Sequence, residues 1–67
     1  MKITINHQIE DVAESASLHD IVYARLGEKQ QGIAVAVNNI VIARGDRPHY
    51  VVQPDDNILI IKATQGG

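Results

Sequence analysis

Residues 17–27 read SLHDIVYARLG, and this stretch predicts an amphipathic helix. Ser17 is a favourable N-cap, and Asp20 stands three residues later, near the position where a capping box places its reciprocal side chain. Four apolar side chains follow at helical spacing: Leu18, Ile21, Val22 and Leu26. They share one face of the helix, which can therefore pack against a core. Gly27 stands where a glycine typically ends a helix.

The segment ahead of this helix predicts a β-hairpin. Residues 1–6 alternate between apolar and polar side chains, which is typical of a half-buried strand. A turn at Asn6-His7 is expected because asparagine tolerates a positive φ. The chain then returns in a second strand over residues 8–12.

The segment after the helix predicts two further strands. Residues 33–37, IAVAV, are apolar throughout, as in a central strand with both faces at least partly covered. Asn38-Asn39 can turn the chain into a strand over residues 40–42. Residues 44–50 contain glycine, proline and charged side chains, so we expect a loop with a short helical turn there.

A last strand is predicted over residues 58–62, after a turn at residues 54–57. In Ile58-Leu59-Ile60-Ile61 both the odd-numbered and the even-numbered residues are apolar. Two large side chains therefore face away from the helix whichever set packs against it. They form either a second small core or a surface that a partner covers. The outward-facing pair is either Leu59 and Ile61 or Ile58 and Ile60.

These elements predict an α+β fold with two layers, because one helix can cover only one face of a sheet. The 67 residues suffice for one domain, residues 1–67, with a flexible tail over residues 64–67. The predicted core contains Ile3, Ile5, Leu18, Ile21, Val22, Leu26 and Val35.

Composition excludes several classes of function. The chain has no cysteine and a net charge of -2, so it offers no catalytic thiol and no basic nucleic-acid surface. No apolar run is long enough to span a membrane, and the N-terminus lacks a signal-peptide core. We therefore expect a cytoplasmic protein that is monomeric when free.

The sequence offers few side chains that are suited to catalysis. The three histidines, at positions 7, 19 and 49, fall in separate elements, so we expect no metal site. Asp55-Asp56 lies in a predicted turn, where Asp bonds to nearby backbone amides. No phosphate-binding glycine motif occurs. The chain is therefore not expected to be an enzyme.

The C-terminal Gly66-Gly67 is the remaining chemical feature. Two residues without Cβ atoms can thread a narrow channel and leave the Gly67 carboxylate open to attack. A carboxylate is inert until its oxygen becomes part of a better leaving group. Activation would therefore require ATP bound by a partner enzyme.

With these features the chain resembles the ubiquitin-like (β-grasp) sulfur carriers, most closely those of thiamin biosynthesis. The resemblance spans the whole chain. It rests on the opening strand, the capped helix, Val35-Ala36-Val37-Asn38, Arg44 and, most specifically, Asp56-Asn57-Ile58 followed by Gly66-Gly67. It implies a mixed sheet of about five strands packed on one helix. By analogy with ubiquitin-like proteins, we expect Leu59 and Ile61 to face outward and to dock a partner, with Ile58 and Ile60 as the opposite choice.

The resemblance also implies a mechanism. An E1-like adenylyltransferase would use ATP to adenylate Gly67, and sulfur from a cysteine desulfurase would replace AMP to give a thiocarboxylate. Thiazole synthase would then take the sulfur, while Gly66 gives access to the partner's active site. The chain itself would bind no cofactor.

The chain departs from the common family pattern at His7 and Asp55, two turn positions where glycine is frequent. Two alternatives stay open. One is the small subunit of a molybdopterin synthase, although those chains usually run longer. The other is a ubiquitin-like modifier or docking module that transfers no sulfur.

Overall fold

The helix begins and ends where the sequence predicts. It is α1, Leu18–Leu26, and both capping-box bonds form. The Asp20 N–H donates to Ser17 Oγ at 3.0 Å, and the Ser17 N–H donates to Asp20 Oδ2 at 3.4 Å. Gly27 ends the helix with a φ of 59°, a conformation that is strained for residues with a Cβ.

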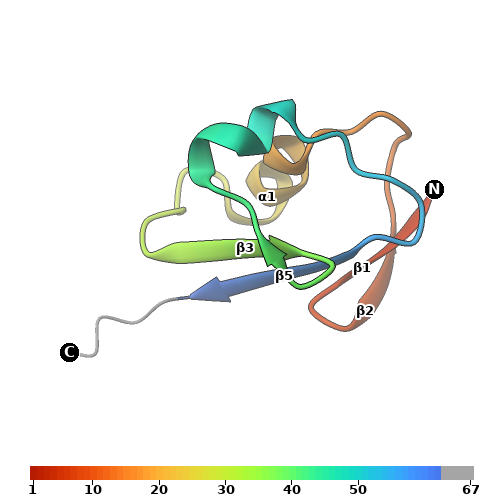
Figure 1. Ribbon diagram of the computed structural model, residues 1–67, viewed down its shortest axis with the longest axis horizontal. Helices are drawn as coiled ribbons and strands as arrows, with labels where there is room; N and C mark the ends of the chain where they lie inside the picture. The colour runs from red at the N-terminus through yellow and green to blue at the C-terminus, as the bar shows by residue number, and fades with distance from the viewer. Residues whose placement is uncertain (63–67) are drawn as a thin grey trace.

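The structure is a computed structural model that describes residues 1–62; the predicted tail over residues 64–67 lies outside them. The five strands are β1 (Lys2–Ile5), β2 (Gln8–Asp11), β3 (Ile33–Val37), β4 (Ile40–Val41) and β5 (Asn57–Lys62). They form one sheet in the order β2-β1-β5-β3-β4. β1 and β5 are parallel and the other pairs are antiparallel. The helix α1 covers one face of this mixed sheet (Figure 1), which confirms the predicted α+β fold.

Two-residue turns connect both hairpins. Asn6 and His7 have φ values of 48° and 71°, and Asn38 and Asn39 have φ values of 50° and 72°. Paired positive φ values match the twist of the flanking strands. His7 thus adopts the left-handed conformation that a glycine would adopt more easily, and Asp55, with a φ of 69°, does the same in the turn before β5.

Three strands are slightly shorter than predicted, and β5 begins one residue earlier. Backbone pairing nevertheless continues past the strand ends. The Val12 N–H donates to the Met1 carbonyl at 2.8 Å, and the Ile42 N–H donates to the Val35 carbonyl at 2.9 Å. The differences therefore concern the residues at the ends of the strands and not the pairing.

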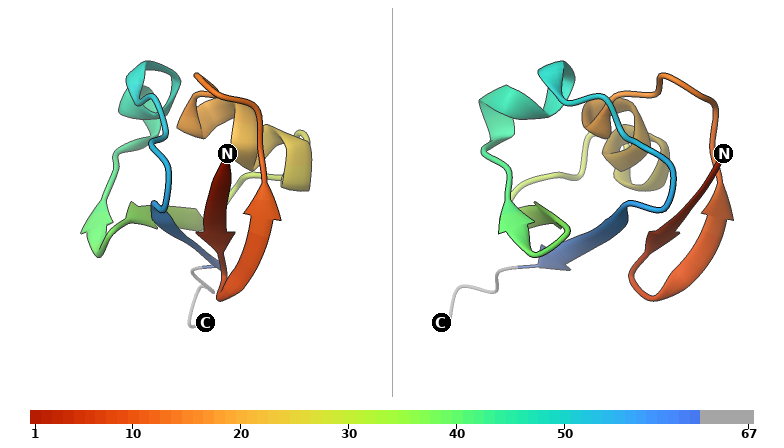
Figure 2. Two further views of the ribbon diagram at one scale, coloured as in Figure 1. Left: turned by 90° about the vertical axis from the view of Figure 1, so that its right-hand side faces the viewer. Right: turned by 45° about the vertical axis from the view of Figure 1, so that its right-hand side comes forward.

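The predicted loop over residues 44–50 forms more regular structure than expected. Arg44–His49 is a 3-10 helix, η1, which lies beside α1 on the same side of the sheet (Figure 2). The Asp46 N–H donates to the Ala43 carbonyl at 2.9 Å, and the Tyr50 N–H to the Arg47 carbonyl at 3.3 Å. Pro48 fits within η1 because its fixed φ is close to the helical value.

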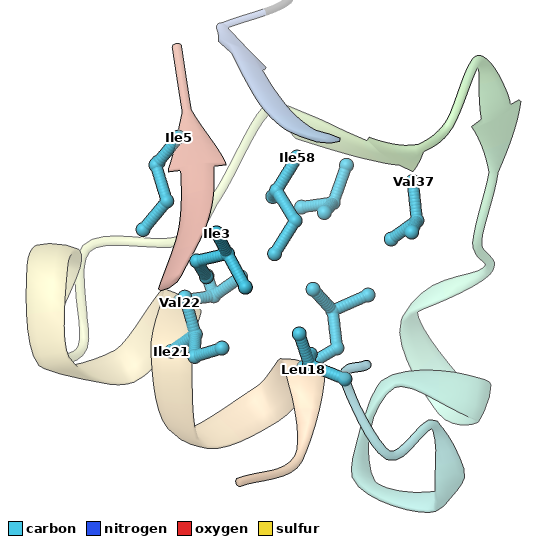
Figure 3. Close-up of a cluster of buried hydrophobic side chains, with 9 residues drawn as sticks. Ile3, Ile5, Leu18, Ile21, Val22, Val37 and Ile58 are labelled. Atoms are coloured by element: carbon cyan, nitrogen blue, oxygen red, sulfur yellow. The ribbon is translucent and has the colours of Figure 1, made fainter. Parts of the chain in front are cut away.

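The hydrophobic core lies between α1 and the sheet, and Figure 3 shows its side chains converging from both layers. Six of the seven predicted core residues are buried, and Leu26 packs at the margin. The core also takes three residues that the prediction omitted: Val37, Val52 and Ile58. Val52 enters it from the segment between η1 and β5.

Candidate functional site

The candidate site begins where β5 leaves the sheet. Gly66 and Gly67 lie outside the described residues, but β5 leads toward them. This strand is central, paired with β1 on one side and β3 on the other. Its carboxyl end lies on the opposite side of the molecule from the N-terminus (Figure 1).

The side chains of β5 alternate between the core and the outer face of the sheet. Ile58 is fully buried, and Ile60 packs against the core. Leu59 is half-buried, and Ile61 is 51% exposed. Since successive side chains of a strand point to opposite faces, Leu59 and Ile61 lie on the face away from α1. Their role in docking stays a prediction.

Neighbouring strands extend this apolar area. The strand register places Ala36 beside Leu59 and Ala34 beside Ile61, and it places Val41 beside Ala36. Paired residues share a face of the sheet. We call these five residues the outer apolar surface: Ala34, Ala36, Val41, Leu59 and Ile61.

The β3 and β4 contributions to this surface were not predicted from the sequence. Residues 33–37 were expected to be covered on both faces at least in part, and this is confirmed, because Ala36 on the outer face is 6% exposed and Ala34 is partly buried. The alternation of Ala34 and Ala36 with larger side chains was the available clue, because small residues leave room for Leu59 and Ile61 between strands. Val41 is 68% exposed.

The acidic pair before β5 is structural. Asp56 is 6% exposed, and its Oδ1 accepts a hydrogen bond from Asn38 Nδ2 at 3.0 Å. Its Oδ2 accepts from the Gln53 N–H at 2.9 Å and from the Tyr50 hydroxyl at 3.2 Å. Burial, followed by the charge of Asp56, raises the pKa of Tyr50. Asp56 therefore joins the β3–β4 turn to the start of β5, and the structural interpretation is confirmed for Asp56, while Asp55 contributes its positive φ to the turn.

The histidines do not converge. His7 lies in the first hairpin turn, His19 in α1 and His49 at the end of η1. Among residues 1–62, no group of His, Asp or Glu side chains is arranged to hold a metal ion. In the same part of the chain, no helix has the length and apolar character needed to cross a membrane.

Known proteins resemble this chain over its full length. The model of the ThiS family matches residues 2–67. The chain is 30% identical over 67 residues to the sulfur carrier protein ThiS of Escherichia coli (strain K12), and the match covers 100% of both chains. The crystal structure of the thiamine biosynthesis protein (ThiS) from Geobacter metallireducens superposes with a TM-score of 0.86 at 23% identity, also over 100% of both chains. This last likeness shows that the β-grasp fold is shared.

Proposed function

The chain belongs to the ThiS family, a family of non-catalytic sulfur carriers, and we propose that its Gly67 carboxylate carries sulfur for thiazole formation in thiamin biosynthesis. The observation that carries this proposal is the family match, which continues through residue 67. It includes the Gly66-Gly67 pair, the one feature of the sequence that presents an accessible carboxylate. It also favours thiazole synthesis over the pterin alternative.

The proposed chemistry takes place in partner enzymes. The Gly67 carboxylate attacks the α-phosphorus of ATP on an E1-like adenylyltransferase, which forms an acyl-adenylate and releases pyrophosphate. A cysteine desulfurase takes sulfur from cysteine as an enzyme-bound persulfide, and the terminal sulfur of this persulfide displaces AMP to form an acyl disulfide. A thiol such as free cysteine then reduces the S–S bond, which leaves the thiocarboxylate on Gly67 and an oxidised disulfide on the donor side. Like other sulfur anions, the thiocarboxylate is a strong nucleophile at neutral pH. Thiazole synthase consumes it as the sulfur donor.

The contribution of this chain is positional. The five residues after Lys62, residues 63–67, span at most about 17 Å when extended. An enzyme that holds Gly67 in its active site therefore also lies close to the end of β5. Gly66 has no side chain to obstruct a narrow channel.

The outer apolar surface is the docking site in this proposal. It lies along β5, the strand that runs into the tail, and Ile61 is only one residue from its end. Two of the five residues of this surface, Val41 and Ile61, are exposed, and exposed apolar residues that share a surface often mark an interaction site. Leu59 and Ile61 would then pack against the adenylyltransferase while the tail enters its active site.

Reconstitution tests the proposal. The protein is incubated with the E1-like enzyme, ATP, a cysteine desulfurase and cysteine, and its C-terminal peptide is analysed by mass spectrometry. We expect one oxygen to be replaced by sulfur at Gly67, and we expect thiazole synthase to consume the product. Linkage of Gly67 to a lysine without sulfur uptake would instead support the modifier alternative.

Two variants distinguish the length of the tail from steric access to the Gly67 carbonyl. Deletion of Gly67 shortens the chain by about 3.5 Å, and an error of 1 Å can already cost about 100-fold in rate, so thiocarboxylate should not form. Gly67→Ala keeps the length but adds a methyl group beside the carbonyl, so it should react slowly. A deletion variant that forms thiocarboxylate as fast as the full-length protein contradicts the proposal.

A further inference from the structure

The guanidinium of Arg47 is buried, and two of its nitrogens have no hydrogen-bond acceptor among residues 1–62. Arg47 lies in η1 and is 4% exposed. Its Nε and Nη1 are buried and have no hydrogen-bond partner within residues 1–62. None of the ion pairs among these residues includes it. Burial of an uncompensated charge is strongly unfavourable, so a bound anion would stabilise this side chain.

Arg47 lines a pocket of about 290 Å³ between α1 and η1, two elements that lie side by side (Figure 2). The helix contributes His19 and Tyr23 to its wall, and η1 contributes Arg44 beside Arg47. The sequence does not indicate that these residues lie together, because residues 44–50 were expected to form a loop. The 3-10 geometry of η1 brings both arginines to the same pocket.

The pocket carries excess positive charge. Burial, followed by the charge of Arg44, lowers the pKa of Arg47, so the two guanidinium groups lie close enough to repel each other. Arginine side chains carry a full positive charge in proteins. Glu28 also lines the pocket, but its Oε2 accepts a hydrogen bond from the Tyr23 hydroxyl at 2.9 Å. Among the described residues it forms no ion pair with either arginine.

We propose that this pocket binds a small oxyanion of the phosphate class between Arg44 and Arg47. A guanidinium presents N–H donors in a fixed fork that matches the oxygens of a phosphate. The oxygens of a phosphate point in several directions and can accept from both guanidinium groups at once, whereas the two oxygens of a carboxylate are matched by the fork of one guanidinium. The pocket is at the lower end of the range for organic ligands, about 300–1,000 Å³, which favours inorganic phosphate, pyrophosphate or a phosphoryl group over a whole nucleotide. This binding does not depend on sulfur transfer.

A titration followed by ¹H–¹⁵N NMR tests the proposal on the full-length protein. Inorganic phosphate, pyrophosphate and acetate are added separately, with sodium chloride adjusted to keep the ionic strength constant. We expect saturable shifts from phosphate and pyrophosphate, confined to η1, the first half of α1 and the loop that contains Glu28. Acetate should give weaker shifts at the same amides.

Three variants identify the binding groups. Arg47→Met keeps an unbranched stem but removes the charge, and Arg44→Gln changes an exposed residue with little risk to folding. Each should weaken phosphate binding at least tenfold. Arg25→Gln is the matched control, because Arg25 pairs with Glu10 at 3.6 Å and does not line this pocket; its affinity should equal that of the unaltered protein.

Several results would overturn the proposal. They are the absence of saturable binding, shifts of similar size around Lys2 and Arg25, acetate binding as tight as phosphate binding, or unchanged affinity in Arg44→Gln. A comparison of pyrophosphate with phosphate then distinguishes a site for a diphosphate from a site for one phosphoryl group. Arg47→Met should also be at least as stable as the unaltered protein in phosphate-free buffer, because it removes an unpaired buried charge.

Discussion

Truncation of Ile61 should weaken association with the adenylyltransferase and leave the fold intact. Full burial of an isoleucine side chain contributes about 1.5–3 kcal/mol. Ile61 is already half covered, at 51% exposed, so a docked enzyme gains roughly half of that range from it. Alanine retains part of this gain, so Ile61→Ala should lose about 1 kcal/mol of binding free energy. That loss corresponds to roughly a fivefold rise in Kd.

The effect is measurable as ATP–pyrophosphate exchange catalysed by the E1-like enzyme at varied concentrations of carrier. We expect KM for the carrier to rise about fivefold with kcat unchanged, because the contact is made equally in the ground and transition states. Ile9→Ala is the matched control. Ile9 is 73% exposed and pairs with Thr4 on the same outer face, but it lies on β2, separated from β5 by β1.

Ile9→Ala should therefore leave KM unchanged. Equal effects of the two variants would show that docking does not centre on β5. A loss of thermal stability in Ile61→Ala as large as that of a core truncation would show instead that Ile61 belongs to the packed interior, and the assignment of the outer apolar surface would fail.

Three further predictions concern stability. Ile21→Ala removes a side chain that is 5% exposed and should cost about 2–5 kcal/mol in urea unfolding; an unchanged midpoint would contradict the helix register. In Gly27→Ala the added Cβ meets no atom within 4 Å, but alanine must adopt a φ of +59°, so the free energy of unfolding should fall by about 1–2 kcal/mol. Gly45→Ala is the matched control, because Gly45 also faces open space but has no positive φ. Its stability should be unchanged or slightly higher. The pKa of Tyr50 is raised in the folded protein, so the neutral phenol stabilises the fold fully below pH 10, and this stabilisation is lost as the pH rises further. The free energy of unfolding of Tyr50→Phe should therefore fall less at alkaline pH than that of the unaltered protein. An equal fall in both proteins would contradict this role of the phenol.

Local chemistry made most of the fold predictable. The capping residues Ser17 and Asp20 fix the start of α1, and Gly27 fixes its end, because each satisfies a requirement that few other residues meet. The asparagine turns fix both hairpins for the same reason. Leu26 is less buried than predicted, since it lies in the last turn of α1, at the edge of the core. Val52 escaped prediction because a long-range contact, and not periodicity, brings it into the core.

The candidate site was predictable to a different extent in each part. Two terminal glycines are chemically distinctive, so the sequence alone predicts Gly66 and Gly67 as the site, and this assignment stays a prediction. The sequence does not decide which residues of β5 face the core, because isoleucine or leucine occupies both faces of the strand. Only the register with β1 and β3 decides which face is covered. Arg47 could not be identified at all, since its burial follows from the packing of η1 on α1, and nothing in its neighbouring residues indicates that contact.

The most direct test of sulfur transfer is the intact mass of the protein isolated from thiamin-starved cells, with a C-terminal peptide to locate any change. The account predicts a fraction of molecules in which one oxygen at Gly67 is replaced by sulfur, and it predicts that this fraction rises when thiazole synthase is removed. A protein that stays unmodified under both conditions, with the adenylyltransferase and desulfurase active, would contradict the account. A sulfur atom located anywhere other than Gly67 would contradict it equally.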